Sequence, residues 1–241
     1  MSRFPSDRLA RLRVFVTIEH PCGYLPGRIA RNLLADPEEV DQDLYQQLAK
    51  LGFRRSGGYI YRPFCPECQA CRSLRIPSDR FCPNRAQRRT WQRNQDLQVF
   101  ECEPHFNPEH YLLYERYLRY RHPGGGMDDT SPQQYLSFVR SIWSHTRFYE
   151  FRQGERLLAV AVVDHLDDGL SAVYTFYTPD EAARSLGTYA ILWQLQEARR
   201  LGLPWVYLGY WVEGCRKMDY KTRFQPHQLY QDGNWRWHTP S

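Results

Sequence analysis

The longest uninterrupted apolar segment of this 241-residue chain covers only residues 157–163. A membrane-spanning helix needs about 20 such residues, so the sequence predicts no membrane span and no membrane partner. Hydrophobic residues still make up 42% of the chain, which is enough for a packed core. The apolar run falls within a series of strands expected at 147–152, 156–163 and 170–177, with a turn near Gly169.

The beginning of the chain, through Arg8, lacks the apolar stretch of a signal peptide. The sequence holds seven cysteines, and without an export signal they are expected as thiols or metal ligands rather than as disulfides. We therefore expect a cytoplasmic protein.

Helix signals precede the strand series, and a helix and a strand follow it. Asp36 and Pro37 are expected to begin a helix that ends at Gly52. Further helices are expected at 84–94, from Asn107 to a break at 123–126, from a capping box at Ser131, and at 187–201. A strand is expected at 204–210. This order predicts an α+β fold, with an N-terminal basic, cysteine-bearing α+β region at 1–103 and a second domain at 104–241.

The positive charge is concentrated in the first part of the chain. Residues 1–100 hold 17 lysines and arginines against 10 acidic residues, whereas residues 101–241 hold 15 against 17. Arginine suits bidentate phosphate contacts and stacking on bases. Four arginines of the helix expected at 84–94 share one face, and a face of one sign favours phosphate binding over a solvated surface. They are Arg85, Arg88, Arg89 and Arg93.

Cys65, Cys68 and Cys71 have a spacing that can bring three thiolates to one ion. Cys22, in an earlier loop, is a candidate fourth ligand for zinc or an iron–sulfur cluster. A set of buried thiols in a tight turn is the alternative explanation.

Several motifs, taken in order, resemble the bacterial aminoacyl-tRNA–protein transferases that are related to eukaryotic arginyltransferases, with most similarity to the aspartate/glutamate leucyltransferase branch. The motifs are Cys22-Gly-Tyr-Leu-Pro-Gly-Arg28, Gly52-Phe-Arg-Arg-Ser-Gly57, Tyr61-Arg-Pro63, Cys65-Pro-x-Cys-x-x-Cys71, Phe81-x-Pro-x-Arg-x-Gln-Arg-Arg89, Ser185-Leu-Gly187, Tyr207-Leu-Gly-Tyr-Trp and Lys217-Met-x-Tyr-Lys221. Eukaryotic relatives carry a second cysteine in the first motif, where this chain has Leu25.

The resemblance implies a GNAT-like acyltransferase domain that transfers leucine from leucyl-tRNA to the N-terminal α-amine of proteins beginning with Asp or Glu, within the N-degron pathway of protein degradation. Transfer requires no cofactor, neither ATP nor acetyl-CoA, because the aminoacyl ester is already activated. A zinc ion or iron–sulfur cluster on the cysteines stays open.

For this reaction, Asp164 is the candidate to hold the attacking amine, with Tyr177 and Tyr210 orienting it. Backbone N–H groups near Leu186 and Gly187 are candidates for stabilising the oxyanion. The acidic side chain of the acceptor needs cations, and the candidates are Arg54, Arg55, Arg62, Lys217 and Lys221. The tRNA acceptor stem is expected along Arg75, Arg85, Arg88, Arg89 and Arg93.

Three alternatives remain at this point. An arginyltransferase would use the same acceptors with another donor. A non-enzymatic RNA-binding protein would use the arginine face alone. An acetyl-CoA acetyltransferase would need a fuller glycine loop than the one at Gly187, where Tyr189 would crowd a pyrophosphate.

Overall fold

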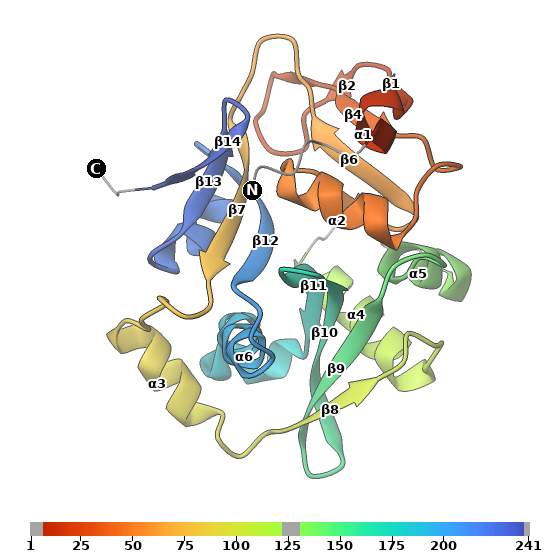
Figure 1. The fold of residues 1–241 in the computed structure, drawn as a ribbon. Helices are drawn as coiled ribbons and strands as arrows, with labels where there is room; N and C mark the ends of the chain where they lie inside the picture. Colours follow the sequence, from red (N-terminus) through yellow and green to blue (C-terminus); the bar gives the residue numbers. More distant parts are fainter. Residues whose placement is uncertain (1–6, 122–130, 239–241) are drawn as a thin grey trace.

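The computed structural model of the chain describes residues 7–121 and 131–238 (Figure 1). The expected helix break at 123–126 lies outside these residues. Within them the structure is a mixed α/β fold, with a small sheet packed above a large one. No helix in the described ranges is both long and apolar enough to cross a membrane.

In the described part of the chain, the large sheet has eight strands in the order β14-β13-β7-β12-β11-β10-β9-β8. Neighbouring strands are antiparallel except β11 and β12, which run parallel. The strands are β7 (Cys71–Pro77), β8 (Gln98–Cys102), β9 (Thr146–Gln153), β10 (Arg156–Leu166), β11 (Gly169–Tyr177), β12 (Trp205–Val212), β13 (Gln228–Gln231) and β14 (Asn234–Trp237).

Helices cover both faces of this sheet, which explains the apolar run at 157–163. On β10, Leu158, Ala161 and Val163 pack on the face that α6 covers, while Val160 and Val162 pack on the opposite face. Strands that are buried on both sides read as continuous apolar segments rather than as alternating ones. The first face is covered by α3 (Arg85–Arg93) and α6 (Leu186–Arg200), and the second by α4 (Pro108–Arg121) and α5 (Pro132–Val139).

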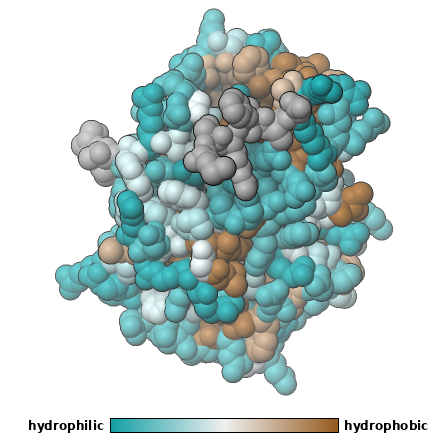
Figure 2. Space-filling view, viewed as in Figure 1, coloured by the Kyte–Doolittle hydropathy of each residue, from teal (hydrophilic) through white to brown (hydrophobic). Residues whose placement is uncertain are grey.

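The small sheet has the order β1-β4-β6-β5 and packs on one helix, α2. Its edge strand β1 exposes all three side chains, and hydrophobic surface is visible over this part of the molecule in Figure 2. The elements are α1 (Asp7–Arg11), β1 (Val14–Val16), β4 (Asn32–Ala35), α2 (Gln42–Lys50), β5 (Arg54–Ser56) and β6 (Tyr59–Pro63), with β2 (His20–Pro21) and β3 (Ile29–Ala30) forming a separate ribbon.

Helix α2 begins later than the sequence predicts. Asp36 is bound by Arg13 at 2.8 Å and caps a turn by accepting from the Glu38 N–H at 3.0 Å. The helix is capped instead by Asp41, whose carboxylate accepts from the Leu44 N–H at 2.9 Å. An Asx turn therefore competes with the helix for the first acidic residue. The capping box at Ser131 is confirmed.

The large sheet includes strands from both sides of the expected domain boundary at 103/104. Strand β7, from the N-terminal part, pairs with β12 and β13 from the C-terminal part, and the three lie side by side in Figure 1. Strand β8 forms the opposite edge beside β9. The boundary between two stretches of sequence is therefore not a boundary between two sheets.

A buried ion pair joins the small sheet to the large one. Arg55 of β5 donates from Nε and Nη2 to the two carboxylate oxygens of Asp164 on β10, at 2.6 and 2.8 Å. Both side chains are 0% exposed. Asp164 also accepts from the hydroxyls of Tyr45 at 2.9 Å and Thr146 at 2.6 Å. Four donors thus satisfy a carboxylate that would otherwise be costly to bury.

Replacing Asp164 with Asn should lower the free energy of unfolding by about 3–5 kcal/mol, because it leaves the Arg55 guanidinium buried without a counter-charge. Denaturant unfolding followed by circular dichroism measures this loss.

The matched control is Asp180→Asn. Asp180 pairs with Arg116 at 2.6 Å, but the two side chains are 45% and 55% exposed. This change should cost no more than about 1 kcal/mol. Equal losses in the two variants would contradict a central structural role for the buried pair.

Candidate functional site

The two parallel strands of the large sheet separate after three residue pairs. Gly169, Leu170 and Ser171 of β11 pair with the first three residues of β12, and beyond them no pairing between the two strands continues. The register of each strand is also irregular here. The pairing of β11 with β10 shifts between Val162 and Val163, and the pairing of β12 with β7 shifts between Tyr207 and Gly209. A cavity of about 590 Å³ lies in the gap, and we call it the strand-opening cavity.

Gly209 shapes the floor of the strand-opening cavity. Its φ of 73° belongs to the left-handed region that glycine adopts without penalty, which allows the bulge in β12. Gly187 borders the cavity from α6, and a Cβ added there would lie 3.1 Å from the Tyr177 ring. Any larger residue at 187 would therefore push the Tyr177 ring away by a few tenths of an ångström.

The N-terminus of α6 meets the same cavity. The helix follows Ser185, which is left-handed and offers no side-chain cap, and the first intrahelical bond runs from Tyr189 N–H to Ser185 O. The N–H groups of the first turn precede that bond and have no helical acceptor. Gly187 and Thr188 line the cavity, so this end of the helix can stabilise an anion or a developing oxyanion. Leu186 contributes only its backbone, since its side chain is in the core.

Two buried cations face the strand-opening cavity. Arg54 of β5 donates to the Ala172 carbonyl at 3.0 Å. Lys221 lies on the 3₁₀ segment η2 (Arg216–Arg223) and donates to the Tyr210 carbonyl at 2.7 Å. Burial lowers the pKa of Lys221 to about 7, and the nearby Arg54 charge adds to the effect. None of the described residues that line the cavity is acidic.

Tyrosines form much of the cavity wall. The Tyr210 hydroxyl lies 3.0 Å from the carbonyl oxygens of both Gly52 and Tyr61, so it fastens β12 to the small sheet. Burial raises the pKa of Tyr210 well above its usual value, which keeps the phenol neutral. Tyr177 packs against Tyr117 with ring centroids 4.8 Å apart and borders the cavity beside Gly187.

The structure gives Asp164 and Arg55 a different role from the expected one. Their side chains are enclosed in the ion pair that joins the two sheets, so neither presents a free polar group to a substrate. Because strand residues alternate in direction, the Arg55 guanidinium enters the interface while its neighbour Arg54 faces the cavity. Arg55 still forms part of the cavity lining, but its charge is taken up by Asp164. The other expected acceptor cations lie outside this cavity: Arg62 lines a second cavity, and Lys217 is exposed and lines neither.

The expected tRNA-binding arginines fall into two groups. Arg85, Arg88, Arg89 and Arg93 are exposed on α3. Arg88 donates to the Pro83 carbonyl at 2.6 Å and Arg93 donates to Ala183 O. Arg75 instead lies between the Trp205 and Trp235 rings, 3.8 and 4.3 Å from their centroids. It is held by Gln228 and Tyr207, so it stabilises the sheet and is not free to bind phosphate.

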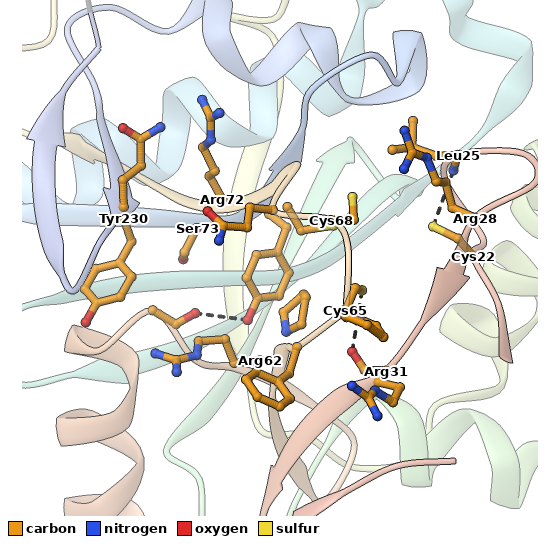
Figure 3. Close-up of a pocket in the computed structure, with 18 of the residues that line it drawn as sticks. Cys22, Leu25, Arg28, Arg31, Arg62, Cys65, Cys68, Arg72, Ser73 and Tyr230 are labelled. Carbon is orange, nitrogen blue, oxygen red and sulfur yellow. Dashed lines mark hydrogen bonds between the residues drawn. The ribbon is translucent and has the colours of Figure 1, made fainter. Parts of the chain in front are cut away.

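The four candidate metal ligands line one further cavity of about 910 Å³, which we call the cysteine cavity (Figure 3). The Cys22 sulfur accepts from the Tyr24 and Leu25 N–H groups at 3.5 and 3.4 Å. Burial, reinforced by the neighbouring thiols, raises the pKa of Cys71 to about 12. Among residues 7–121 and 131–238, no three His, Cys, Asp or Glu side chains stand close enough together to hold an ion.

Several cavity residues were not singled out from the sequence. Tyr24 and Tyr220 lie inside motifs that carried the family resemblance, which was the available signal for them. Met218 lies in the same motif as Tyr220, whereas Arg121 and Tyr174 lie in none of the motifs. These three residues come from η2, α4 and β11, and only the fold brings them together. No local sequence pattern shows that these three segments meet.

Comparison with known proteins agrees with this architecture. Family models described as arginine-tRNA-protein transferase, N terminus, and arginine-tRNA-protein transferase, C terminus, match residues 20–89 and 109–231. An aspartate/glutamate leucyltransferase of Nitrosococcus oceani is 53% identical over 223 residues, covering 92% of this chain and 94% of that protein. One from Pseudomonas aeruginosa is 52% identical over 228 residues, covering 94% and 97%.

Among solved structures, L-PGS from Bacillus licheniformis matches with a TM-score of 0.52 at 12% identity, covering 70% of this chain and 59% of that one. At this identity the match concerns the fold alone. The family models and the two leucyltransferase relatives extend over most of the sequence, and the resemblance predicted from its motifs is confirmed: the chain belongs to the arginine-tRNA-protein transferase family, alongside relatives named aspartate/glutamate leucyltransferases.

Proposed function

We propose that this chain transfers leucine from leucyl-tRNA to the N-terminal α-amine of proteins that begin with Asp or Glu. The names of the similar proteins give the reaction class. The reaction belongs in the cytoplasm, where charged tRNA is made, and an N-terminal leucine added there serves the N-degron pathway.

The cation content of the strand-opening cavity is the observation that carries the proposal. Arg54 and Lys221 are buried there, and no acidic residue among the described lining residues neutralises them. Unpaired buried cations are costly, and a carboxylate from the substrate would relieve that cost. An acceptor with an Asp or Glu side chain supplies this group beside its reactive amine.

The same cavity favours leucine over arginine as the donor. Ile191, Leu208 and Met218 give it apolar surface, and tyrosine rings cover much of the rest. A leucine side chain can be buried against such a wall. An arginine side chain would add a further cation without a carboxylate to meet it, so arginyl transfer is the disfavoured alternative.

In the reaction, the neutral α-amine attacks the ester carbonyl of leucyl-tRNA and a tetrahedral intermediate forms. Its oxyanion is stabilised by the free N–H groups of Gly187 and Thr188 at the start of α6. The carbon–oxygen bond to the tRNA then breaks as the amide forms. The amine loses a proton and the departing ribose oxygen gains one, so deacylated tRNA leaves as an alcohol.

We assign this arrangement to the GNAT-like class of acyltransferases. Support comes from the parting of β11 and β12 and from the helix N-terminus that faces the gap. The exposed arginines of α3 are the proposed contacts for the tRNA acceptor stem: Arg85, Arg88, Arg89 and Arg93.

Purified protein mixed with leucyl-tRNA and a peptide that begins with Asp should yield a peptide heavier by one leucine, as read by mass spectrometry. Product formed with arginyl-tRNA but not with leucyl-tRNA would show that the donor amino acid is arginine rather than leucine. Absence of product from both, with folded protein, would support an RNA-binding protein instead.

Replacing Arg54 with Gln should raise the KM for the Asp peptide about tenfold or more, because a charge-assisted hydrogen bond to the substrate carboxylate is lost. Steady-state kinetics with the peptide varied and leucyl-tRNA saturating measures this. Lys217→Gln is the matched control, since Lys217 is exposed and outside the cavity. An equal effect of both changes would move the acceptor site towards Lys217.

The KM for the Asp peptide should also rise several-fold between pH 7 and pH 9. The pKa of Lys221 is lowered to about 7, so its charged form is present below that pH and is lost above it. Lys221→Arg keeps the charge throughout and should flatten the dependence. A parallel rise in both proteins would exclude Lys221 as the titrating group.

Transfer should survive removal of metal by a chelator, because no step of the reaction uses one. Elemental analysis before and after treatment reports any zinc or iron held by Cys22, Cys65, Cys68 and Cys71, and circular dichroism reports the fold. Loss of transfer from folded, metal-free protein, restored by adding the metal back, would contradict this expectation.

A further inference from the structure

The cysteine cavity carries a concentration of arginines that its thiols do not explain. Arg28, Arg31, Arg62 and Arg72 line it, and Asp232 is the one acidic side chain among the described lining residues. Figure 3 shows these arginines approaching from separate parts of the chain. Cations gathered from distant segments create a positive potential that attracts an anion.

Internal partners only partly neutralise these charges. Arg72 pairs with Glu213 at 2.9 Å and Arg31 approaches Glu19 at 3.7 Å, and both carboxylates are more than half exposed. Arg62 has no carboxylate within ion-pair distance in the described residues. It donates to the Leu51 carbonyl at 3.3 Å and lies over the Phe53 ring at 4.9 Å. Its charge is therefore available to a ligand.

Two buried donors at the cavity lack hydrogen-bond partners. They are Ser73 Oγ and Arg31 Nε, and Ser73 is only 2% exposed. Both residues line the cavity. A buried donor without an acceptor costs about 1–3 kcal/mol, so a ligand oxygen that came within hydrogen-bond distance of either atom would offset that cost.

The cavity also offers aromatic surface and lies next to the strand-opening cavity. Phe64 is 49% exposed on its lining, and Tyr230 also lines the cavity (Figure 3). Aromatic faces beside cations are the usual elements for binding single-stranded nucleic acid. Tyr210 borders both this cavity and the strand-opening cavity, so the two cavities are adjacent.

We propose that the cysteine cavity binds the phosphodiester groups of the unpaired 3′ end of the donor tRNA, with Arg28, Arg31, Arg62 and Ser73 as the contacts. This inference rests on the proposed function, which places the aminoacyl ester in the adjacent cavity. It goes beyond that function by giving the end of the tRNA a site separate from the arginines of α3.

The test compares binding of two RNA probes by fluorescence anisotropy: deacylated tRNA, and the same tRNA trimmed of its unpaired 3′ nucleotides. Wild-type protein should bind the intact tRNA more tightly. Arg62→Gln should lower that affinity about tenfold, towards that of the trimmed tRNA, whose binding should not change. The slope of log affinity against log salt for intact tRNA should fall by about 0.7 for each phosphate contact removed.

Arg28→Gln is the second variant, because Arg28 is exposed and its loss is not expected to disturb folding. Arg116→Gln, on α4, is the control and should bind both probes as the wild type does. Equal binding of the two probes by wild-type protein would overturn the inference. So would a loss shared equally by intact and trimmed tRNA in the variants.

The arginines could instead neutralise thiolates around a metal ion. In that case Arg62→Gln would lower the metal content in elemental analysis and leave discrimination between the probes unchanged, which would overturn the inference. Because binding needs no transfer, it is read independently of the proposed function. If the wild-type protein transfers leucine but both variants bind intact tRNA as the wild type does, the proposed site for the 3′ end is wrong and the proposed function still stands.

Discussion

The buried pair between Arg55 and Asp164 is the interaction on which the rest of the structure depends. It fixes β5 of the small sheet against β10 of the large one, with four donors converging on a single carboxylate. Since side chains alternate along a strand, fixing Arg55 in the interface also directs Arg54 into the strand-opening cavity. The structural ion pair of Arg55 thereby positions Arg54, the proposed functional cation. A shift of β5 by one residue would exchange the positions of Arg54 and Arg55.

The buried cations of the strand-opening cavity lower the stability of the empty protein and strengthen its attraction for an anion. Arg54 and Lys221 are desolvated without an acidic neighbour among the described lining residues, which is unfavourable in the empty protein. In return, a carboxylate entering this low-dielectric space interacts more strongly than it would in water. The depressed pKa of Lys221 limits the cost, because part of the population sheds its charge near neutral pH until an anion arrives.

Local signals predicted most of the helices and the central strands, because caps and apolar periodicity are properties of neighbouring residues. The position of Asp41, rather than Asp36, at the start of α2 depended on Arg13 binding the earlier carboxylate. Contacts between residues far apart in the sequence could not be predicted from local patterns. Arg55 and Asp164 are 109 positions apart, and Arg75 meets Trp205 and Trp235 only after β7 and β14 join the large sheet. Residue type indicated a cation at each site, but only the fold separates the cations that face a cavity from those that hold the sheet.

The place of β7 within the large sheet has a consequence for synthesis of the protein on the ribosome. Its partners β12 and β13 are the last parts of the sheet to be translated, apart from β14. At roughly 5–20 residues per second, β7 waits on the order of ten seconds for β12. Throughout that interval its two edges are unpaired, and apolar side chains such as Leu74 and Ile76 are without their core. Strand β7 therefore cannot complete its pairing before the chain is nearly finished, and until then its edges are open to pairing with other chains.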